Sequence, residues 1–336
     1  MSGFDAYGVT SSEGGSGESN VDFDAINSYV IKTVDCEQPE TMNGYISMIV
    51  DLGTQKQPDG EWNLDDEDVG LTVEELTEKH AELIADGKIN KFELSYDNDV
   101  KAKVIKKFVP QKDRQSIVYA VDFPDIQLDK GQFFGNDTGE TKPLRLWIGG
   151  QFWNPYQSKM LVQNMIPLKI VKDDKIGWTM NPKSSTYKIA LASRLIKTGE
   201  SFMPESIDKL LGQTLQFQIQ IFNQSGKNGK TYYTEKLKFV GAIQKKDKPF
   251  EGVETKLIQF NKENDVEALK EVRNHVLHTI MQATNFEGSA IHKQLLEVRP
   301  KLFDGVANSV TNTTKTNAVV EDVKKEVTPA DDEGWD

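Results

Sequence analysis

The sequence of 336 residues predicts a mainly β protein, a small barrel or sandwich with an acidic helical insertion and added C-terminal helices. Two observations predict this class. Six or seven short segments between Gly44 and Ile243 resemble strands, because their apolar residues alternate with polar ones or form short runs bounded by turn residues. After residue 251 the apolar residues recur at helical spacing instead.

The first hundred residues are expected to hold a leader, two strands and the insertion. Residues 1–20 are rich in Gly and Ser, which predicts a disordered leader before a body that spans 21–250. The runs YVIKTV and GYISMIVDLG read as strands of this body. Residues 55–100 form an acidic insertion, in which Thr72 and Glu75 predict the capping box of a short helix.

The net charge of −12 is distributed unevenly along the chain. Residues 1–100 hold 5 Lys and Arg against 23 Asp and Glu, residues 101–250 hold 25 against 13, and residues 251–336 hold 10 against 16. A basic middle segment between acidic ends is the pattern expected of a nucleic-acid-binding body, although the whole chain is acidic. The acids of the insertion are either a solvated face or a competitor for DNA phosphates.

The basic part opens with KAKVIKKFVPQKDR and continues with two predicted strands, QSIVYAVDFPDI and KPLRLWIGGQFW. Aromatic residues are interleaved with cations near the second strand, a composition that suits stacking on unpaired bases, although alternation predicts that some of these rings are core. The pieces MIPLKIV and STYKIALA are also read as β-like, and they flank a turn at Asp173–Asp174.

The strongest strand signal is a hairpin within residues 207–243. Apolar residues and glutamines alternate strictly over 215–221, and a second alternating run follows the turn sequence SGKNGK. We expect Tyr233, Leu237 and Phe239 on the buried face and glutamines, Tyr232 and lysines on the open face. Such a face suits a flexible polyanion, and the alternative is an ordinary solvated face.

The C-terminal part is expected to be a helical extension over 251–303, with helices within 264–298 that begin at Asn264 or Asp265 and stop before Pro300. Residues 304–336 read as a disordered acidic tail. The residues of this tail that we expect to bind partner proteins are Asp331, Asp332, Glu333, Trp335 and Asp336.

Several function classes are disfavoured. A single cysteine and four histidines leave no disulfide and no plausible zinc site, and we expect neither a metal nor a cofactor. Asp122, Asp125 and Asp129 are the nearest carboxylate cluster for a nuclease, but no Glu-x-Lys strand follows, so no enzyme is expected. No apolar run is long enough for a membrane helix and no signal peptide is recognisable, which predicts a cytoplasmic protein without membrane contact.

Three segments resemble the single-stranded DNA-binding proteins of tailed bacteriophages: GYISMIVDLGTQ, LLGQTLQFQIQIFNQSGKNGKTYYTEKLKFVGAI and DDEGWD. The resemblance covers about a quarter of the chain. It implies an OB-fold, sequence-independent binding of single strands in phage replication or recombination, and a tail that recruits enzymes and competes with DNA. Residues 55–110 and the helices within 264–298 are additions to that pattern, and the tail ends in Trp-Asp.

The candidate DNA-binding residues are Lys103, Lys106, Lys107, Arg145, Trp147, Trp153, Tyr156, Lys188, Arg194, Lys227, Lys230, Tyr232, Lys236 and Lys238. The expected partners are single-stranded DNA and, through the tail, replication or recombination enzymes. Homo-oligomerisation through the C-terminal helices is compatible with the sequence. The alternative function is a β-rich virion structural or adaptor protein that does not bind DNA.

Overall fold

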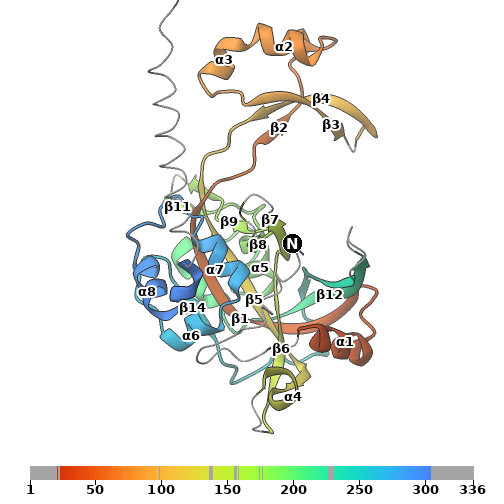
Figure 1. Cartoon of the computed structure of the whole chain (residues 1–336), viewed down its shortest axis with the longest axis vertical. Helices are drawn as coiled ribbons and strands as arrows, with labels where there is room; N and C mark the ends of the chain where they lie inside the picture. Colours follow the sequence, from red (N-terminus) through yellow and green to blue (C-terminus); the bar gives the residue numbers. More distant parts are fainter. Residues whose placement is uncertain are drawn as a thin grey trace, which may run out of the picture.

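Figure 1 shows a computed structural model in which a β-rich body carries a smaller inserted unit on two connecting segments. The structure describes residues 21, 23–97, 99–135, 139–154, 157, 159–173, 175, 177–225 and 231–303. The predicted leader, the predicted tail and the tip of the hairpin lie outside these residues.

The body is built on one large sheet of antiparallel strands in the order β13-β12-β1-β5-β6. Their bounds are β1 (Glu40–Gln55), β5 (Arg114–Asp129), β6 (Thr141–Trp147), β12 (Thr214–Ser225) and β13 (Thr231–Ala242). Two short strands join it, β9 (Ile166–Pro167) beside β5 and β14 (Lys256–Ile258) parallel to β1. The mainly β prediction is confirmed. The described residues form no closed barrel, because β6 and β13, at the two ends of this order, share no ladder.

The hairpin prediction is confirmed by β12 and β13. Phe217, Ile219 and Ile221 are completely buried, and Leu237 lies beside them with 9% of its surface exposed. The glutamines between these residues point to the opposite face, as the strict alternation predicts. A register shift between Gln216 and Phe217 leaves Val240 as an extra residue, so β13 is bulged near its end.

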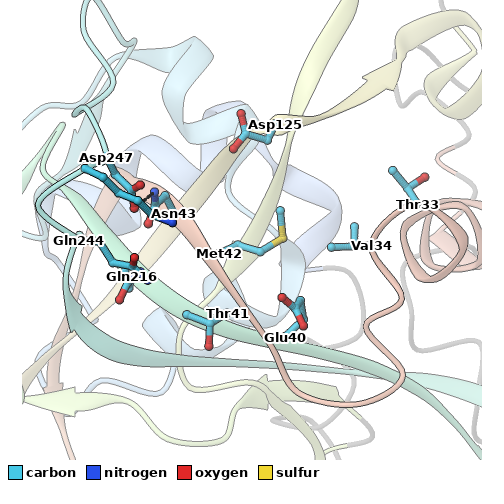
Figure 2. Close-up of a pocket in the computed structure, with 11 residues that line it drawn as sticks. Thr33, Val34, Glu40, Thr41, Met42, Asn43, Asp125, Gln216, Gln244 and Asp247 are labelled. Carbon is cyan, nitrogen blue, oxygen red and sulfur yellow. Dashed lines mark hydrogen bonds between the residues drawn. The ribbon is translucent and has the colours of Figure 1, made fainter.

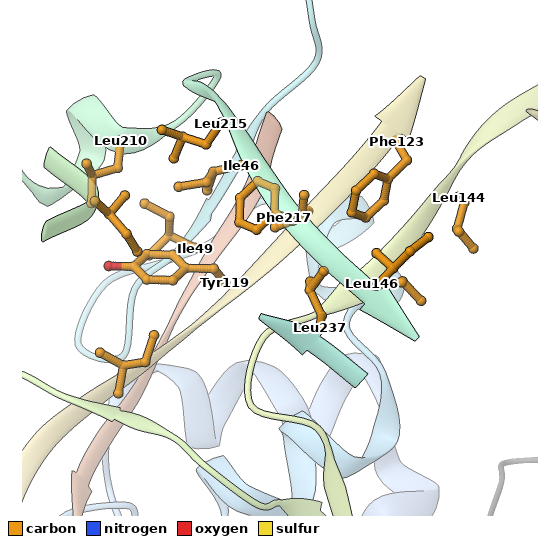
Figure 3. Close-up of a cluster of buried hydrophobic side chains, with 14 of the residues drawn as sticks. Ile46, Ile49, Tyr119, Phe123, Leu144, Leu146, Leu210, Leu215, Phe217 and Leu237 are labelled. Carbon is orange, nitrogen blue, oxygen red and sulfur yellow. The ribbon is translucent and has the colours of Figure 1, made fainter. Parts of the chain in front are cut away.

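The inner face of the sheet holds one apolar core (Figure 3). Two helices cover it, and both were expected to be strands: α1 (Phe23–Val34), which contains YVIKTV, and α5 (Ser185–Ala192), which is STYKIALA. In α1, Ile26 and Val30 are buried four residues apart, which is helical spacing. The Ser184 hydroxyl accepts a hydrogen bond from the Tyr187 N–H and begins α5. The short helix α4 (Lys130–Phe134) completes this layer.

The outer face of β1, β5 and β6 is covered by the C-terminal helices, which form a second core with it. The helices expected within 264–298 are α6 (Val266–Glu271), α7 (Asn274–Ile280) and α8 (Ala290–Val298), and a short 3-10 helix, η4 (Pro300–Phe303), follows them. The Asp265 side chain caps α6, as one of the two predicted caps. The helical extension is therefore packed on the sheet and is not a separate appendage.

The insertion has its own small core and lies between β1 and β5. A sheet in the order β2-β4-β3 carries two short helices on one side (Figure 1). The elements are β2 (Gly60–Trp62), η2 (Asp66–Asp68), α2 (Val73–Lys79), α3 (Ala81–Ala85), β3 (Lys91–Asp97) and β4 (Ala102–Val109). The capping box of Thr72 and Glu75 is confirmed. The predicted boundary near residue 100 is too early, because the basic strand β4 pairs with β2 and β3.

Two small hairpins and a 3-10 helix lie between β6 and β12. The hairpins pair β7 (Gln151–Asn154) with β8 (Lys159–Val162) and β10 (Ile170–Asp173) with β11 (Gly177–Met180), and the helix is η3 (Pro204–Leu210). Within the described part of the chain, every helix falls short of the length and apolar character that a membrane crossing requires.

Candidate nucleic-acid interface

The outer face of the β12–β13 hairpin is a row of polar and basic side chains. Direct cross-strand pairing sets Gln218 beside Lys238 and Gln220 beside Lys236. Both lysines are exposed, and neither makes an ion pair within the described residues. The opposite face of the same strands is part of the core, so the register of the hairpin places these lysines on the solvent-exposed face. We call Gln218, Gln220, Phe222, Lys236 and Lys238 the outer hairpin face.

Phe222 adds an aromatic ring to the outer hairpin face. It belongs to the outward-pointing set of β12, and the Lys236 Nζ lies 4.7 Å from the centre of its ring. This cation–π contact stabilises the observed positions of the two side chains. The Phe222 ring is partly exposed. A stacking surface and a phosphate-binding charge therefore lie next to each other on this face.

The hairpin is held in place from two sides. The Gln220 side-chain amide donates to the Glu37 carbonyl at 3.0 Å. On the inner side of β13, Glu235 accepts a hydrogen bond from Arg273 at 3.1 Å. The Arg273 guanidinium also donates to the Arg145 carbonyl of β6, so one side chain connects the two ends of the large sheet. The outer hairpin face is thus carried by a fixed strand pair.

Trp147 and Arg145 were predicted to bind DNA, and their surroundings give them structural roles instead. Trp147 is 4% exposed, beneath α7, where its ring meets His275 edge-on at 6.2 Å. Arg145 donates to Asp122 at 2.7 and 3.0 Å and to Glu271 of α6 at 2.7 Å. Both side chains point to the face that the C-terminal helices cover. The sequence around β6 does not reveal that these helices cover this face.

The row that contains Arg145 crosses three strands. Tyr45 is paired with Asp122 and Asp122 with Arg145, and the Tyr45 hydroxyl lies 3.4 Å from the Asp122 carboxylate. Burial, followed by the negative charge of Asp122, raises the pKa of Tyr45 to about 12. The carboxylate of Asp122 accepts a further hydrogen bond from Ser47 at 2.6 Å. The charged groups here are paired with one another under the helices, so Arg145 is engaged within the body.

Lys103, Lys106 and Lys107 lie on β4 of the insertion and are not part of the large sheet. Lys106 is 9% exposed and is bound by Asp97 and Asn63, and Lys107 pairs with Asp65 at 2.8 Å. Lys103 is exposed and makes no ion pair within the described residues. Of the three predicted lysines, Lys103 is therefore the one available to a ligand.

The remaining predictions are distributed over several elements. Trp153 is partly exposed on the β7–β8 hairpin, and Lys188 is exposed on α5. Arg194 is exposed and ends α5 with a left-handed backbone of φ 60°. Tyr232 is placed only by its backbone in β13, opposite Gln224. The predicted residues that lie outside the described part of the chain are Tyr156, Lys227, Lys230, Asp331, Asp332, Glu333, Trp335 and Asp336.

The β7–β8 hairpin approaches the middle of β13. A Cβ atom at Gly150, just before β7, would lie 4.0 Å from the Glu235 carbonyl oxygen. Phe152 follows it with 39% of its surface exposed. The aromatic hairpin is therefore attached close to the strand that carries Lys236 and Lys238.

Sequence reasoning missed two aromatic residues that the structure exposes beside a lysine, Trp178 and Phe222. Trp178 is 61% exposed and is paired with Lys172 across the β10–β11 hairpin. Phe222 on the outer hairpin face is the other. The sequence holds a signal for each. Phe222 is the next outward position after Gln220 in the alternating run, and Trp178 follows the turn signal at Asp173–Asp174.

A polar depression of about 440 Å³ lies near the start of β1 (Figure 2). Asn43 donates to Asp247 at 2.9 Å within it, and Glu40 and Asp125 add two more carboxylates. Lys246 is the basic residue of its lining. Three carboxylates against one lysine disfavour a polyanion at this place, so it lies outside the candidate interface.

Neither a group of possible metal ligands among the described residues nor a comparison with known proteins assigns a further site to this chain. Over the described ranges, no group of three or more His, Cys, Asp or Glu side chains is arranged to hold a metal ion. His275 is buried against Trp147, and His278 contacts the Met160 carbonyl. No protein-family model, no curated protein and no solved structure matches this chain.

Proposed function

We propose that this protein binds single-stranded DNA without reading its sequence and acts in phage DNA replication or recombination. The observation that carries the proposal is the outer hairpin face, where Lys236 and Lys238 are exposed beside Phe222 on a strand pair whose opposite face is core. Lysines neutralise backbone phosphates, and an aromatic ring stacks on any base, so this combination binds a single strand of any sequence.

The proposal includes an OB-fold for the body. In that fold five strands form a partly open barrel, and the strand order β13-β12-β1-β5-β6, with α5 between β6 and β12, supports this assignment. The ends of the order are joined by Arg273, which donates to Glu235 of β13 and to the carbonyl of Arg145 in β6. In this proposal a side-chain bridge replaces the last ladder of the barrel.

In this proposal the DNA path avoids one surface that OB-folds ordinarily use. Oligonucleotides commonly bind the face of the second and third strands, which are β5 and β6 in this assignment. Here the C-terminal helices pack on that face and bury Trp147. In this proposal the DNA strand therefore binds the exposed side of β12 and β13 and the β7–β8 hairpin that lies beside them.

The acidic tail is proposed to recruit replication or recombination enzymes and to compete with DNA for the lysines. Residues 329–336 contain four carboxylate side chains and one tryptophan. Carboxylates are attracted to the same cations as phosphates, while an exposed tryptophan can anchor in a pocket of a partner protein. Removal of the tail is then expected to tighten DNA binding.

The test is a fluorescence-anisotropy titration of labelled poly-dT, and of a duplex of equal length, at two salt concentrations. We expect the full-length protein to favour the single strand, and Lys236→Ala with Lys238→Ala to weaken binding. The slope of log K against log salt should fall in magnitude by about 1.4, since each phosphate contact on a single strand contributes about 0.7. Deletion of 329–336 should strengthen binding.

The control variant is Lys262→Ala with Lys293→Ala, which removes the same charge from exposed positions of the helical extension. Its affinity and salt slope should match those of the wild type. If both double variants weaken binding equally, the hairpin is not the binding face. If neither the intact protein nor the tail deletion binds any strand at low salt, the virion structural or adaptor alternative is the better assignment.

A further inference from the structure

The tip of the β3–β4 hairpin in the insertion exposes apolar and basic side chains together. Tyr96 is paired with Lys103, and Leu94 with Ile105, on one face of the inserted sheet. Leu94 and Tyr96 are each 56% exposed, and Val100 in the turn is 62% exposed. We call Leu94, Tyr96, Val100 and Lys103 the arm tip.

The exposure of the arm tip follows from where the inserted helices end. Phe92, Leu94 and Tyr96 alternate along β3 and share one face. Phe92 is 4% exposed because it packs with Leu76 of α2, whereas Leu94 and Tyr96 lie beyond the helices. Large apolar residues left uncovered at the end of a small sheet mark a contact surface.

The charges around the arm tip favour a polyanion as the occupant. Residues 93–103 contain three acids and two lysines, but Glu93 is paired with Lys91 and Asp97 with Lys106, which leaves Lys101 and Lys103 against Asp99. Lys106 and Lys107 are engaged by Asp97 and Asp65, and Lys103 is left beside Tyr96. An exposed lysine paired with an exposed tyrosine repeats the combination of the outer hairpin face.

The insertion is suited to act as an arm. Its elements pack around their own core, and it is joined to the body by the segments between β1 and β2 and between β4 and β5 (Figure 1). We propose that the arm tip is a second contact for the same DNA strand, in which Tyr96 stacks on a base and Lys103 binds a phosphate. This inference rests on the proposed function of the body. The acidic helices repel the strand and direct it to the basic end of the arm.

The test compares strands of two lengths, about 10 and about 40 nucleotides, since OB-type sites cover about 4–16 nucleotides. Tyr96→Ala with Lys103→Ala should weaken binding of the long strand roughly tenfold. Binding of the short strand, which the outer hairpin face alone can hold, should be unchanged. A strand that carries 5-iodouracil should crosslink to Tyr96 in the wild-type protein.

The matched control is Val69→Ala with Lys88→Ala, which removes one exposed apolar residue and one exposed lysine elsewhere in the insertion. It should bind both strands like the wild type, and circular dichroism should show that both variants keep the wild-type fold. The arm contact alone would be overturned if the Tyr96→Ala, Lys103→Ala variant and the control variant both bind the long strand as tightly as the wild type does. In that case the Lys236→Ala, Lys238→Ala variant should still have lost binding. Absence of DNA binding by the wild type would overturn the proposed function as well.

Discussion

Arg273 and Glu235 form the charged contact that joins the C-terminal helices to β13, with an N–H···O distance of 3.1 Å. The same guanidinium donates to the Arg145 carbonyl of β6 at 3.2 Å. Less than a quarter of either side chain is exposed, at 23% for Arg273 and 17% for Glu235. The contact therefore lies between the two ends of the sheet and is largely shielded from solvent.

Replacement of Arg273 tests this bridge. Arg273→Ala should lower the free energy of unfolding by about 1.5–3 kcal/mol, because hydrogen bonds to a charged group are lost and Glu235 is left without its partner. Arg273→Lys should recover only part of the loss, since an ammonium group cannot reach both acceptors in the same geometry. Urea denaturation of the single variants and of the double variant with Glu235→Ala measures the coupling. Strictly additive losses would show that the two residues do not interact.

The buried His275 predicts a pH dependence of stability. Burial, together with the positive charges of Arg273 and His278, lowers the pKa of His275 to about 3. Above about pH 6.5 the imidazole is neutral in both states. As the pH falls from there towards 3, His275 binds a proton in the unfolded chain but not in the folded chain. The free energy of unfolding therefore falls by up to about 1.4 kcal/mol per pH unit.

The measurement is thermal denaturation at several pH values between 7 and 4.5, where most carboxylates remain charged. His275→Phe keeps a ring against Trp147 and removes the titration. The wild type should lose more stability than this variant over the interval. Equal pH slopes for the two proteins would mean that His275 takes up its proton in the folded state.

The burial of Trp147 separates its role in stability from any role in DNA binding. Trp147→Ala should cost about 3–5 kcal/mol, the range found for removal of a buried large aromatic residue. Trp147→Phe should cost less, and it should leave the affinity for poly-dT unchanged in protein that is folded. A large loss of affinity in Trp147→Phe, with the thermal midpoint retained, would restore Trp147 to the interface.

Gly53 tests the packing of β1 beneath the helical extension. Its φ of +74° is unfavourable for other residues, and a Cβ atom would lie 2.3 Å from the Phe260 ring. Gly199 has a φ of +87° with nothing within 4 Å, so Gly199→Ala isolates the backbone cost of about 1–2 kcal/mol. Gly53→Ala should cost about 1–3 kcal/mol more because of the overlap. Equal midpoints of urea unfolding would show that Phe260 moves away freely.

The elements that the sequence predicted correctly are those whose own residues determine them. The alternation over 215–221 sets which side of β12 is buried, and Thr72 with Glu75 begins α2 through local hydrogen bonds. Short apolar segments were read wrongly at α1 and α5. Runs of this length fit both a buried strand and a buried helix, and contacts with the rest of the core decide between them.

By itself the sequence determined the mainly β class, the lysine face of the hairpin and the separation of basic from acidic segments. Only the tertiary structure decided which cations and rings remain accessible. Trp147 and Arg145 are covered by helices that begin more than a hundred residues later, and Lys106 is enclosed within the insertion. Periodicity reports which face of a strand is buried or exposed locally, but the segment that covers a face is chosen by packing between distant parts of the chain.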